Sequence, residues 1–398
     1  MNSLKKYKLD ELYKMGSGIS SAKRQSGHGF PFLSFSTIFN NYIVPDILPD
    51  MMDTTDRQRE DSSIKKGDVF ITRTSETPDE LGMSCVALKD YPNATFTGFA
   101  KRLRPITDEV YPKYIAYYLR APYFRKMINA NTVMTLRASF NDQIFSYLNI
   151  FLPKYDQQVK IGDMLYSIER KIEINNRIND NLQQSLKLIY QQWFFKFDFP
   201  DIKNKPYSSN GGKLVWNEAI KRNIPLNWYI KTLSNSTDMY QPETFDAKLL
   251  VANGHYRVYG AGGFMGYYDK YNHNDSEIFI SCRGSCGNIY RSLPNSLITG
   301  NAMIVHPKEI EYSDYLYLTL SEIGVKNCIT GSVQPQITRD NLNDWKYCLP
   351  PLEIVRKFNE ISNPISAKIM NNIVENEKLE KLRNELLPLL MNGQVSIA

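Results

Sequence analysis

Two long stretches of the chain carry apolar residues that alternate three and four positions apart, the spacing of a helix face that packs against another helix. In the first stretch we expect this face to consist of Ile161, Leu165, Ile168, Ile172, Asn175, Asn179, Leu182, Leu186 and Ile189. In the second we expect Phe358, Ile361, Ile365, Ile369, Ile373, Leu379, Leu382 and Leu386. The pattern predicts long helices over residues 154–198 and 351–393, packed against each other as an antiparallel coiled coil. An ordinary core helix is the alternative reading of either stripe.

Polar residues and a proline interrupt these stripes. Asn175 and Asn179 lie in the middle of the first one, where a buried asparagine fixes the register of paired helices at a cost in stability. Pro364 lies inside the second stripe. Because proline lacks a backbone N–H and clashes with the preceding turn, we expect a kink or a restart of the helix there. Gly393 is a stop signal, which leaves residues 394–398 as a tail.

The rest of the chain lacks helical periodicity over most of its length. Residues 1–153 and 227–350 combine short strand-like runs, such as Val69 to Thr72 and Ile278 to Ser281, with turns and with short helical patterns at 112–119 and 312–320. Residues 199–226 are rich in Pro, Gly, Ser and charge and are interpreted as a linker. The predicted fold class is α+β, with two globular mixed α/β domains separated by two long helices.

The chain also repeats itself with a period of about 200 residues. The junction Asn149-Ile-Phe-Leu-Pro-Lys-Tyr-Asp156 is matched by Lys346-Tyr-Cys-Leu-Pro-Pro-Leu-Glu353. Ala138-Ser-Phe140 matches Pro335-Gln-Ile337, Asp68-Val-Phe-Ile-Thr-Arg73 matches Glu277-Ile-Phe-Ile-Ser-Cys-Arg283, and Arg104-Pro105 matches His306-Pro307. Chance could produce one such match, but four in the same order predict a duplication and hence an internal pseudo-two-fold repeat.

Charge is distributed unequally between the two predicted domains. Residues 1–153 carry 20 Lys and Arg against 16 Asp and Glu, a net charge of +4, whereas residues 227–350 carry 10 against 12, a net charge of −2. The whole chain is only mildly basic, at +6. Total charge therefore gives only modest support for nucleic-acid binding, which depends on local Lys and Arg side chains.

No catalytic or metal-binding motif survives inspection. The chain has no phosphate-binding loop of the G-x-x-x-x-G-K-[ST] type, no dinucleotide fingerprint, and no Asn/Asp-Pro-Pro-aromatic loop of an amino-methyltransferase. Cys282 and Cys286, with His255, His273 and His306 in the same half, have poor spacing for a zinc site. The five cysteines, the absence of a secretory signal and the absence of a long apolar segment predict a cytoplasmic protein with free thiols. We expect neither a catalytic residue nor a metal ion in this chain.

Candidate DNA-contacting residues occur at matched places in both halves. Phosphate contacts need Arg and Lys, and base edges are read by Arg, Lys, Asn and Gln. The candidates in the first half are Arg57, Lys65, Lys66, Arg73, Lys101, Arg102, Arg104 and Arg137. Those in the second half are Arg257, Tyr259, Arg283, Asn288, Arg291, Gln334, Gln336 and Arg339. Each one alone is more often a solvated surface side chain, and the set gains weight from its duplicated positions.

The whole chain resembles the specificity subunit of type I restriction-modification systems. The resemblance rests on the order of several motifs around the duplicated plan. These are Leu349-Pro-Pro-Leu-Glu353 and its weaker twin Leu152-Pro-Lys-Tyr-Asp-Gln-Gln158, Gln191-Gln-Trp-Phe-Phe195, Gly211-Gly-Lys-Leu-Val-Trp216, Ile224-Pro-Leu-Asn-Trp228, Ile280-Ser-Cys-Arg-Gly-Ser-Cys-Gly287 and Thr299-Gly-Asn-Ala302. The chain departs from the family at Lys154, where a second proline is common, and at Ile354, where a glutamine is usual.

The resemblance implies a non-catalytic DNA-recognition subunit. Residues 1–153 and 227–350 would be two target-recognition domains that read the two halves of a split, asymmetric site on double-stranded DNA, and the long helices would set the unread spacer. Two methyltransferase subunits using S-adenosylmethionine would dock on this chain. Two restriction and translocase subunits using ATP with magnesium would complete the enzyme, and this chain would hold no cofactor of its own.

Three other functions remain as alternatives. A stand-alone bipartite DNA-binding regulator would show a fully polar outer face on the helix pair, whereas apolar residues left exposed there would favour partner subunits. An enzyme with degenerate motifs is disfavoured by the missing motifs. A purely structural coiled-coil adaptor is disfavoured because most of the chain lies in the two globular domains.

Overall fold

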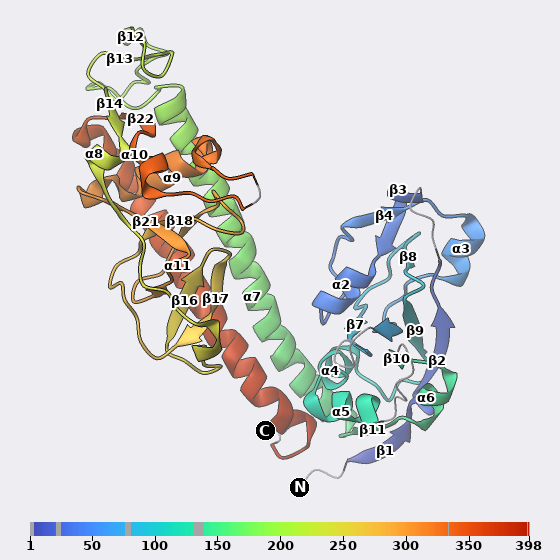
Figure 1. Cartoon of the computed structure of the whole chain (residues 1–398). Helices are drawn as coiled ribbons and strands as arrows, with labels where there is room; N and C mark the ends of the chain where they lie inside the picture. Colours follow the sequence, from blue (N-terminus) through green and yellow to red (C-terminus); the bar gives the residue numbers. More distant parts are fainter. Residues whose placement is uncertain are drawn as a thin grey trace. The chain divides into compact units, whose positions relative to one another are not determined.

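The computed structural model describes residues 4–20, 25–75, 81–130, 138–332, 334–395 and 397. The chain divides into two compact units, which are described separately. Unit 1 consists of Met1–Ile174 and Glu375–Ala398, and unit 2 consists of Asn175–Val374. Each unit combines one globular domain with a segment of each of two long helices (Figure 1).

The domain of unit 1 is built on two sheets and two ribbons. Its strands are β1 (Lys5–Lys8), β2 (Tyr13–Ser17), β3 (Ser26–Leu33), β4 (Asp50–Met52), β5 (Val69–Thr72), β6 (Thr74–Ser75), β7 (Ser84–Val86), β8 (Thr95–Phe96), β9 (Ala100–Pro105), β10 (Ala138–Ser139) and β11 (Asn149–Leu152). Its short helices are α1 (Leu9–Leu12), α2 (Phe35–Asn40), α3 (Asp56–Asp61), α4 (Pro112–Tyr118), α5 (Pro122–Ala130) and α6 (Asp142–Tyr147). The sheet orders are β2-β9-β5-β7 and β4-β3-β8, and the ribbons pair β1 with β11 and β6 with β10.

The domain of unit 2 has the same plan. Its strands are β12 (Leu214–Asn217), β13 (Arg222–Pro225), β14 (Tyr229–Thr232), β15 (Thr237–Tyr240), β16 (Tyr256–Gly260), β17 (Gly263–Tyr268), β18 (Ile278–Ser281), β19 (Ile289–Arg291), β20 (Leu297–Ile298), β21 (Ala302–Pro307) and β22 (Lys346–Leu349). Its short helices are α8 (Leu233–Ser236), α9 (Ser313–Ile323) and α10 (Arg339–Asn343). The sheet orders are β15-β21-β18-β19 and β17-β16-β20, and the ribbons pair β14 with β22 and β12 with β13.

The two sheet plans confirm the predicted duplication. β2, β9, β5 and β7 occupy the places of β15, β21, β18 and β19, and all neighbours in both sheets are antiparallel. Each three-stranded sheet contains a parallel pair, and the two pairs are formed by equivalent strands, β3 with β8 and β16 with β20. The first and last strands of each domain, β1 with β11 and β14 with β22, pair directly before a long helix begins.

Burial on both faces explains the central strands. Every residue of β5 and of β18 is buried, in agreement with their continuous apolar and β-branched sequences. In each unit a helix segment completes the domain core. Leu165 and Leu390 join the core of unit 1, while Tyr190 and Phe358 join that of unit 2.

The two long helices form as predicted. α7 spans Tyr155–Tyr190 and is followed by a π-helical turn, Gln191–Phe195, and α11 spans Leu352–Met391 (Figure 1). Gly162 lets α7 approach α4 closely, because a Cβ at Gly162 would lie 2.7 Å from the backbone nitrogen of Tyr114. The helix segments run antiparallel within each unit, as ion pairs of Glu169 with Arg383 and Lys171 with Glu375 show in unit 1.

The inner stripe of α11 is more polar than predicted. Leu382, which we expected in the interface, is 44% exposed, whereas the neighbouring Arg383 turns inward to Glu169. Ser362 and Asn372, which the apolar pattern omitted, are buried. In unit 2 the Asn372 side-chain amide donates to Oδ1 of Asn179 at 2.8 Å, so one of the predicted register asparagines is matched by an asparagine on the other helix.

Two further expectations differ from the structure. α11 does not restart at Pro364 but continues as one helix through it. The Pro364 side chain is exposed, so water can hydrate the Glu360 carbonyl, which loses its N–H partner. Part of the segment 199–226 is ordered, because Leu214–Asn217 and Arg222–Pro225 form a hairpin and Ile224 joins the core of unit 2.

Candidate nucleic-acid interface

Two loops of unit 2 meet at the end of β18 and carry four of the predicted DNA-contacting residues. The first loop is residues 282–288, and the second is residues 330–332 and 334–337; we call them the paired loops. Arg283 and Gln336 form an isolated antiparallel bridge, and the Ile337 N–H donates to the Cys282 carbonyl at 3.1 Å. The exposed predicted residues on these loops and the helix that follows are Arg283, Asn288, Gln334, Gln336 and Arg339.

Unit 1 has an equivalent pair of segments after β5. Ser75 pairs with Ala138 and Thr74 with Ser139, while the Phe140 N–H donates to the Arg73 carbonyl at 2.8 Å. These are the positions that the sequence repeat aligned with the paired loops of unit 2. Arg73 is exposed beside them. Arg137, another predicted contact, lies outside the described residues.

Three other predicted residues of unit 1 have exposed side chains. Lys65 and Lys66 are exposed in the turn before β5, and Arg57 is exposed on α3 near Asp61. The turn is held by its backbone, because the Lys65 N–H donates to Asp68 and the Lys66 N–H to Asp90. The two ammonium groups therefore project from an ordered turn, which suits phosphate contacts. Lys101 is half-buried, and its ammonium group donates to Ser17 Oγ at 3.0 Å.

Arg104 and Arg102 are instead held inside unit 1. The Arg104 guanidinium donates to both oxygens of the buried Asp68, at 2.8 and 2.7 Å. Its hydrogen bond to that carboxylate raises the pKa of Arg104. Arg102 donates to the carbonyl of Ser63 at 2.7 Å. These predicted contacts are thus occupied in holding the loop after α3 against β9.

Unit 2 places a different pair at the positions equivalent to Asp68 and Arg104. Nδ1 of His306 lies 2.9 Å from Oε2 and 3.1 Å from Oε1 of the buried Glu277. Burial raises the pKa of Glu277, and the hydrogen bond and charge of His306 oppose that shift. His273 is buried nearby, and its burial, followed by the charge of His306, lowers the pKa of His273.

Three more predicted residues of unit 2 face its interior. Arg291 forms an ion pair with Asp314 and donates to Ser313 Oγ. Tyr259 is buried, and its hydroxyl accepts from the Leu293 N–H and from Arg257. The guanidinium of Arg257 also lies 4.1 Å from the ring centroid of Phe264. All three side chains shape the domain around the hairpin of β16 and β17.

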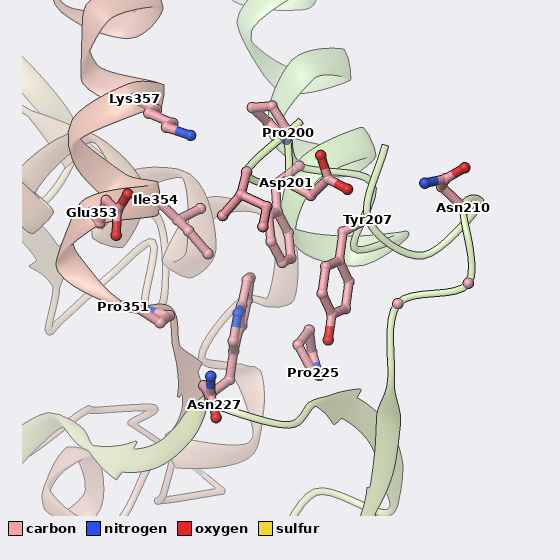
Figure 2. A pocket seen from close by; sticks show the side chains of 15 residues that line it. Pro200, Asp201, Tyr207, Asn210, Pro225, Asn227, Pro351, Glu353, Ile354 and Lys357 are labelled. Atoms are coloured by element: carbon pink, nitrogen blue, oxygen red, sulfur yellow. The ribbon is translucent and has the colours of Figure 1, made fainter. Parts of the chain in front are cut away.

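A pocket of unit 2, with a volume of about 530 Å³, lies between the segment after α7 and the start of α11 (Figure 2). Phe199, Tyr207 and Trp228 form its aromatic wall, with Phe199 stacked on Tyr207 at a centroid distance of 4.7 Å. The surrounding segment exposes several large apolar side chains, namely Phe195, Ile202, Leu214, Trp216, Leu226 and Tyr229. Ile202, at the pocket edge, is 94% exposed. Sequence analysis did not identify this surface. The feature that could have indicated it is the presence of large apolar residues within an otherwise polar linker.

The described residues show no group of three or more His, Cys, Asp or Glu side chains placed to hold a metal ion. Cys286 donates its S–H to the carbonyls of Cys282 and Pro335 at 2.9 and 3.0 Å, so this thiol ties the paired loops together. Burial raises the pKa of the Cys282 thiol to about 11, which keeps it protonated at neutral pH. A helix with the length and apolar character for crossing a bilayer is not found in the described part of the chain.

Comparisons with known proteins give one consistent result. The model of the type I restriction modification DNA specificity domain matches residues 1–184 and 225–388. The MjaIX specificity subunit of Methanocaldococcus jannaschii is 23% identical over 83% of this chain and 78% of its own length. The HindI specificity subunit of Haemophilus influenzae is 20% identical over 99% of this chain and 100% of its own length. The crystal structure of the type I S subunit from M. genitalium has the same fold, with a TM-score of 0.63 at 17% identity, covering 98% of this chain and 96% of that one.

Proposed function

The chain belongs to the family of type I restriction-modification DNA specificity subunits, and from this premise we propose how its two units divide the recognition of DNA. A specificity subunit is the non-catalytic DNA-recognition component of a larger enzyme. Each domain reads one half of a bipartite site in double-stranded DNA. Because the paired loops of unit 2 and the equivalent segments of unit 1 carry different side chains, the two half-sites differ in sequence.

The observation that carries this proposal is the recurrence of the paired segments on the same sheet plan. Arg73 in unit 1 and Arg283 in unit 2 both follow the central buried strand. In unit 2 the exposed amides of Asn288, Gln334 and Gln336 lie on the same loops. Arg reads guanine and Asn or Gln reads adenine through paired hydrogen bonds in the major groove.

Partner subunits dock on apolar surfaces that the units leave exposed. Ile174 and Leu382 are exposed on the helix segments of unit 1, and Leu188 is exposed on that of unit 2. An isolated DNA-binding regulator would present polar side chains there. We assign these surfaces, together with the apolar residues around the pocket of Figure 2, to methyltransferase subunits.

The duplication favours two methyltransferase subunits, one for each unit. In both domains the first and last strands pair directly before a long helix begins, so each unit offers an equivalent surface. These subunits would bring S-adenosylmethionine and methylate adenine. Two restriction and translocase subunits, using ATP and magnesium, would complete the enzyme in the cytoplasm. The chain itself contributes recognition and assembly.

Single-molecule sequencing tests the proposal in a host that expresses the chain with its neighbouring methyltransferase. We expect N6-methyladenine in a split, asymmetric motif with a fixed spacer, which disappears when the chain is deleted. Gln336→Ala should change the accepted bases in one half of the motif and leave the other half intact. A palindromic motif, or methylation that persists without the chain, would contradict the proposal.

A further inference from the structure

The hairpin of β16 and β17 exposes two consecutive apolar side chains near its end. Gly260 to Gly263 make the turn, and Phe264 and Met265 follow at the start of β17 (Figure 1). Tyr259 pairs with Phe264 and Val258 with Gly266, so Met265 is the extra residue of a β-bulge next to Phe264. Phe264 is 43% exposed and Met265 is 41% exposed. Two neighbouring apolar side chains are therefore partly exposed at this end of the hairpin.

Glycine makes this arrangement possible. Gly263 has φ +89°, and a Cβ there would lie 3.0 Å from the ring of Tyr290. A Cβ at Gly260 would lie 2.3 Å from Sδ of Met265. The turn therefore packs directly on Tyr290, and Met265 lies across the turn, where any larger residue would displace it.

Tyr290 joins this hairpin end to the paired loops. One side of its ring faces Gly263, and its hydroxyl accepts a hydrogen bond from the Asn288 amide at 3.3 Å. Tyr290 also stacks on the buried Phe279 at a centroid distance of 5.3 Å, which anchors it in the core. The hairpin end and the loop of residues 282–288 therefore share one support and approach a ligand together.

The chemistry of the hairpin end fits the stacked bases of DNA. The Arg257 guanidinium lies over the Phe264 ring, and Arg257 Nη1 donates a hydrogen bond to the Tyr259 hydroxyl at 3.1 Å. Arg257 is therefore held in place by Phe264 and Tyr259. Proteins that bend DNA insert Phe, Leu, Ile or Met side chains between base pairs, beside cations that contact the backbone. A protein partner would also accept an apolar end, but the link through Tyr290 to Asn288, a candidate base-contacting amide, favours nucleic acid.

We propose that Phe264 and Met265 insert at a base step beside the half-site read by unit 2 and unstack that step. This inference rests on the proposed function. The glycine turn brings the backbone close to the groove, and the ring of Phe264 stacks on the exposed base. Unit 2, with a net charge of −2 over residues 227–350, would thereby gain affinity that does not depend on phosphate contacts.

The test uses the assembled complex with its methyltransferase and a duplex carrying the motif found by sequencing. 2-Aminopurine is placed at successive positions in and beside the second half-site. The methylated adenine itself is left unlabelled, because methyltransferases extrude their target base. We expect one step to gain fluorescence on binding, and Phe264→Ala to abolish that gain. Affinity should fall about 5- to 100-fold, as expected for one lost aromatic–base stack.

Matched variants separate stacking from other effects. Phe264→Tyr should keep the fluorescence gain, and Met265→Ala should reduce it. Ile310→Ala removes an exposed apolar side chain from the turn Ile310–Tyr312 of the same unit and should change nothing. Unchanged fluorescence and affinity in a folded Phe264→Ala complex that still methylates its motif would overturn the inference alone. A Phe264→Ala chain that binds DNA but loses its methyltransferase would assign the hairpin end to protein docking and overturn it too. Absence of any methylated motif would instead count against the proposed function.

Discussion

The two units have the same strand plan but hold it together with different chemistry. In unit 1, the Arg104 guanidinium donates two hydrogen bonds to the buried Asp68 carboxylate. In unit 2, the equivalent places hold His306 and the buried Glu277, which form a hydrogen-bonded pair. The exposed candidates of unit 1 are Lys and Arg, whereas those of unit 2 include three amides. The shared fold therefore depends on the apolar positions of the strands and helices. The polar pairs and the loop side chains differ between the two units.

The largest predicted effect comes from breaking the two equivalent pairs. Asp68→Asn leaves the Arg104 guanidinium beside an uncharged partner in a buried place, and we expect a loss of about 3 kcal/mol in the free energy of unfolding. Glu277→Gln replaces the carboxylate beside His306 with an amide that can still form a hydrogen bond, so we expect a smaller loss in the free energy of unfolding, about 1–2 kcal/mol. Chemical denaturation followed by hydrogen exchange in each unit measures both. Equal losses would mean that the pairs are equivalent in strength despite their chemistry.

The next effect concerns how the two units hold DNA. Arg283→Ala or Gln336→Ala should cost about 1–3 kcal/mol in binding and relax one position of the motif. Lys66→Ala should weaken binding to all sequences, lower the slope of log affinity against log salt by about 1, and leave the motif unchanged. Titrations across a salt series, combined with methylation sequencing, distinguish the two outcomes. A changed motif in the Lys66→Ala variant would contradict the proposal that Lys66 contacts phosphates and does not read bases.

The smallest predicted effect is a pH dependence confined to unit 2. Since the pKa of His273 is lowered in the folded protein, the unfolded chain binds more protons below pH 6.5, and stability falls as the pH falls through that region. Glu277 acts in the opposite direction because its pKa is raised in the folded protein. Its contribution to stability falls as the pH rises above the ordinary pKa of a glutamate. His273→Gln should remove the histidine contribution, on the order of 1 kcal/mol between pH 7 and pH 5.5.

Glu277 and His306 remain in both proteins, so the difference between wild type and His273→Gln isolates the histidine. Melting temperatures at several pH values measure it, with hydrogen exchange in unit 1 as the internal control. If exchange in unit 1 changes as much as in unit 2, the pH dependence does not arise at His273.

The sequence predicted the elements with a strong periodic or apolar pattern. The long helices, the central strands and the duplicated order all follow from where Val, Ile, Leu and Phe recur. Asn372 and Ser362 were missed because a search for apolar stripes passes over buried polar residues. The orientation of Arg104 and Arg291 was not predictable, since each depends on an acidic partner, Asp68 or Asp314, that only the fold brings near.

The pairing of the first and last strands of each domain has a consequence for how such a protein changes. Lys5–Lys8 pairs with Asn149–Leu152, and Tyr229–Thr232 pairs with Lys346–Leu349. Each domain thus enters and leaves through two adjacent strands, and segments with adjacent ends can be replaced with little disturbance to their surroundings. A domain from another protein of this plan could be grafted through two cuts, at the strand ends, so that one half-site changes while the helices stay untouched.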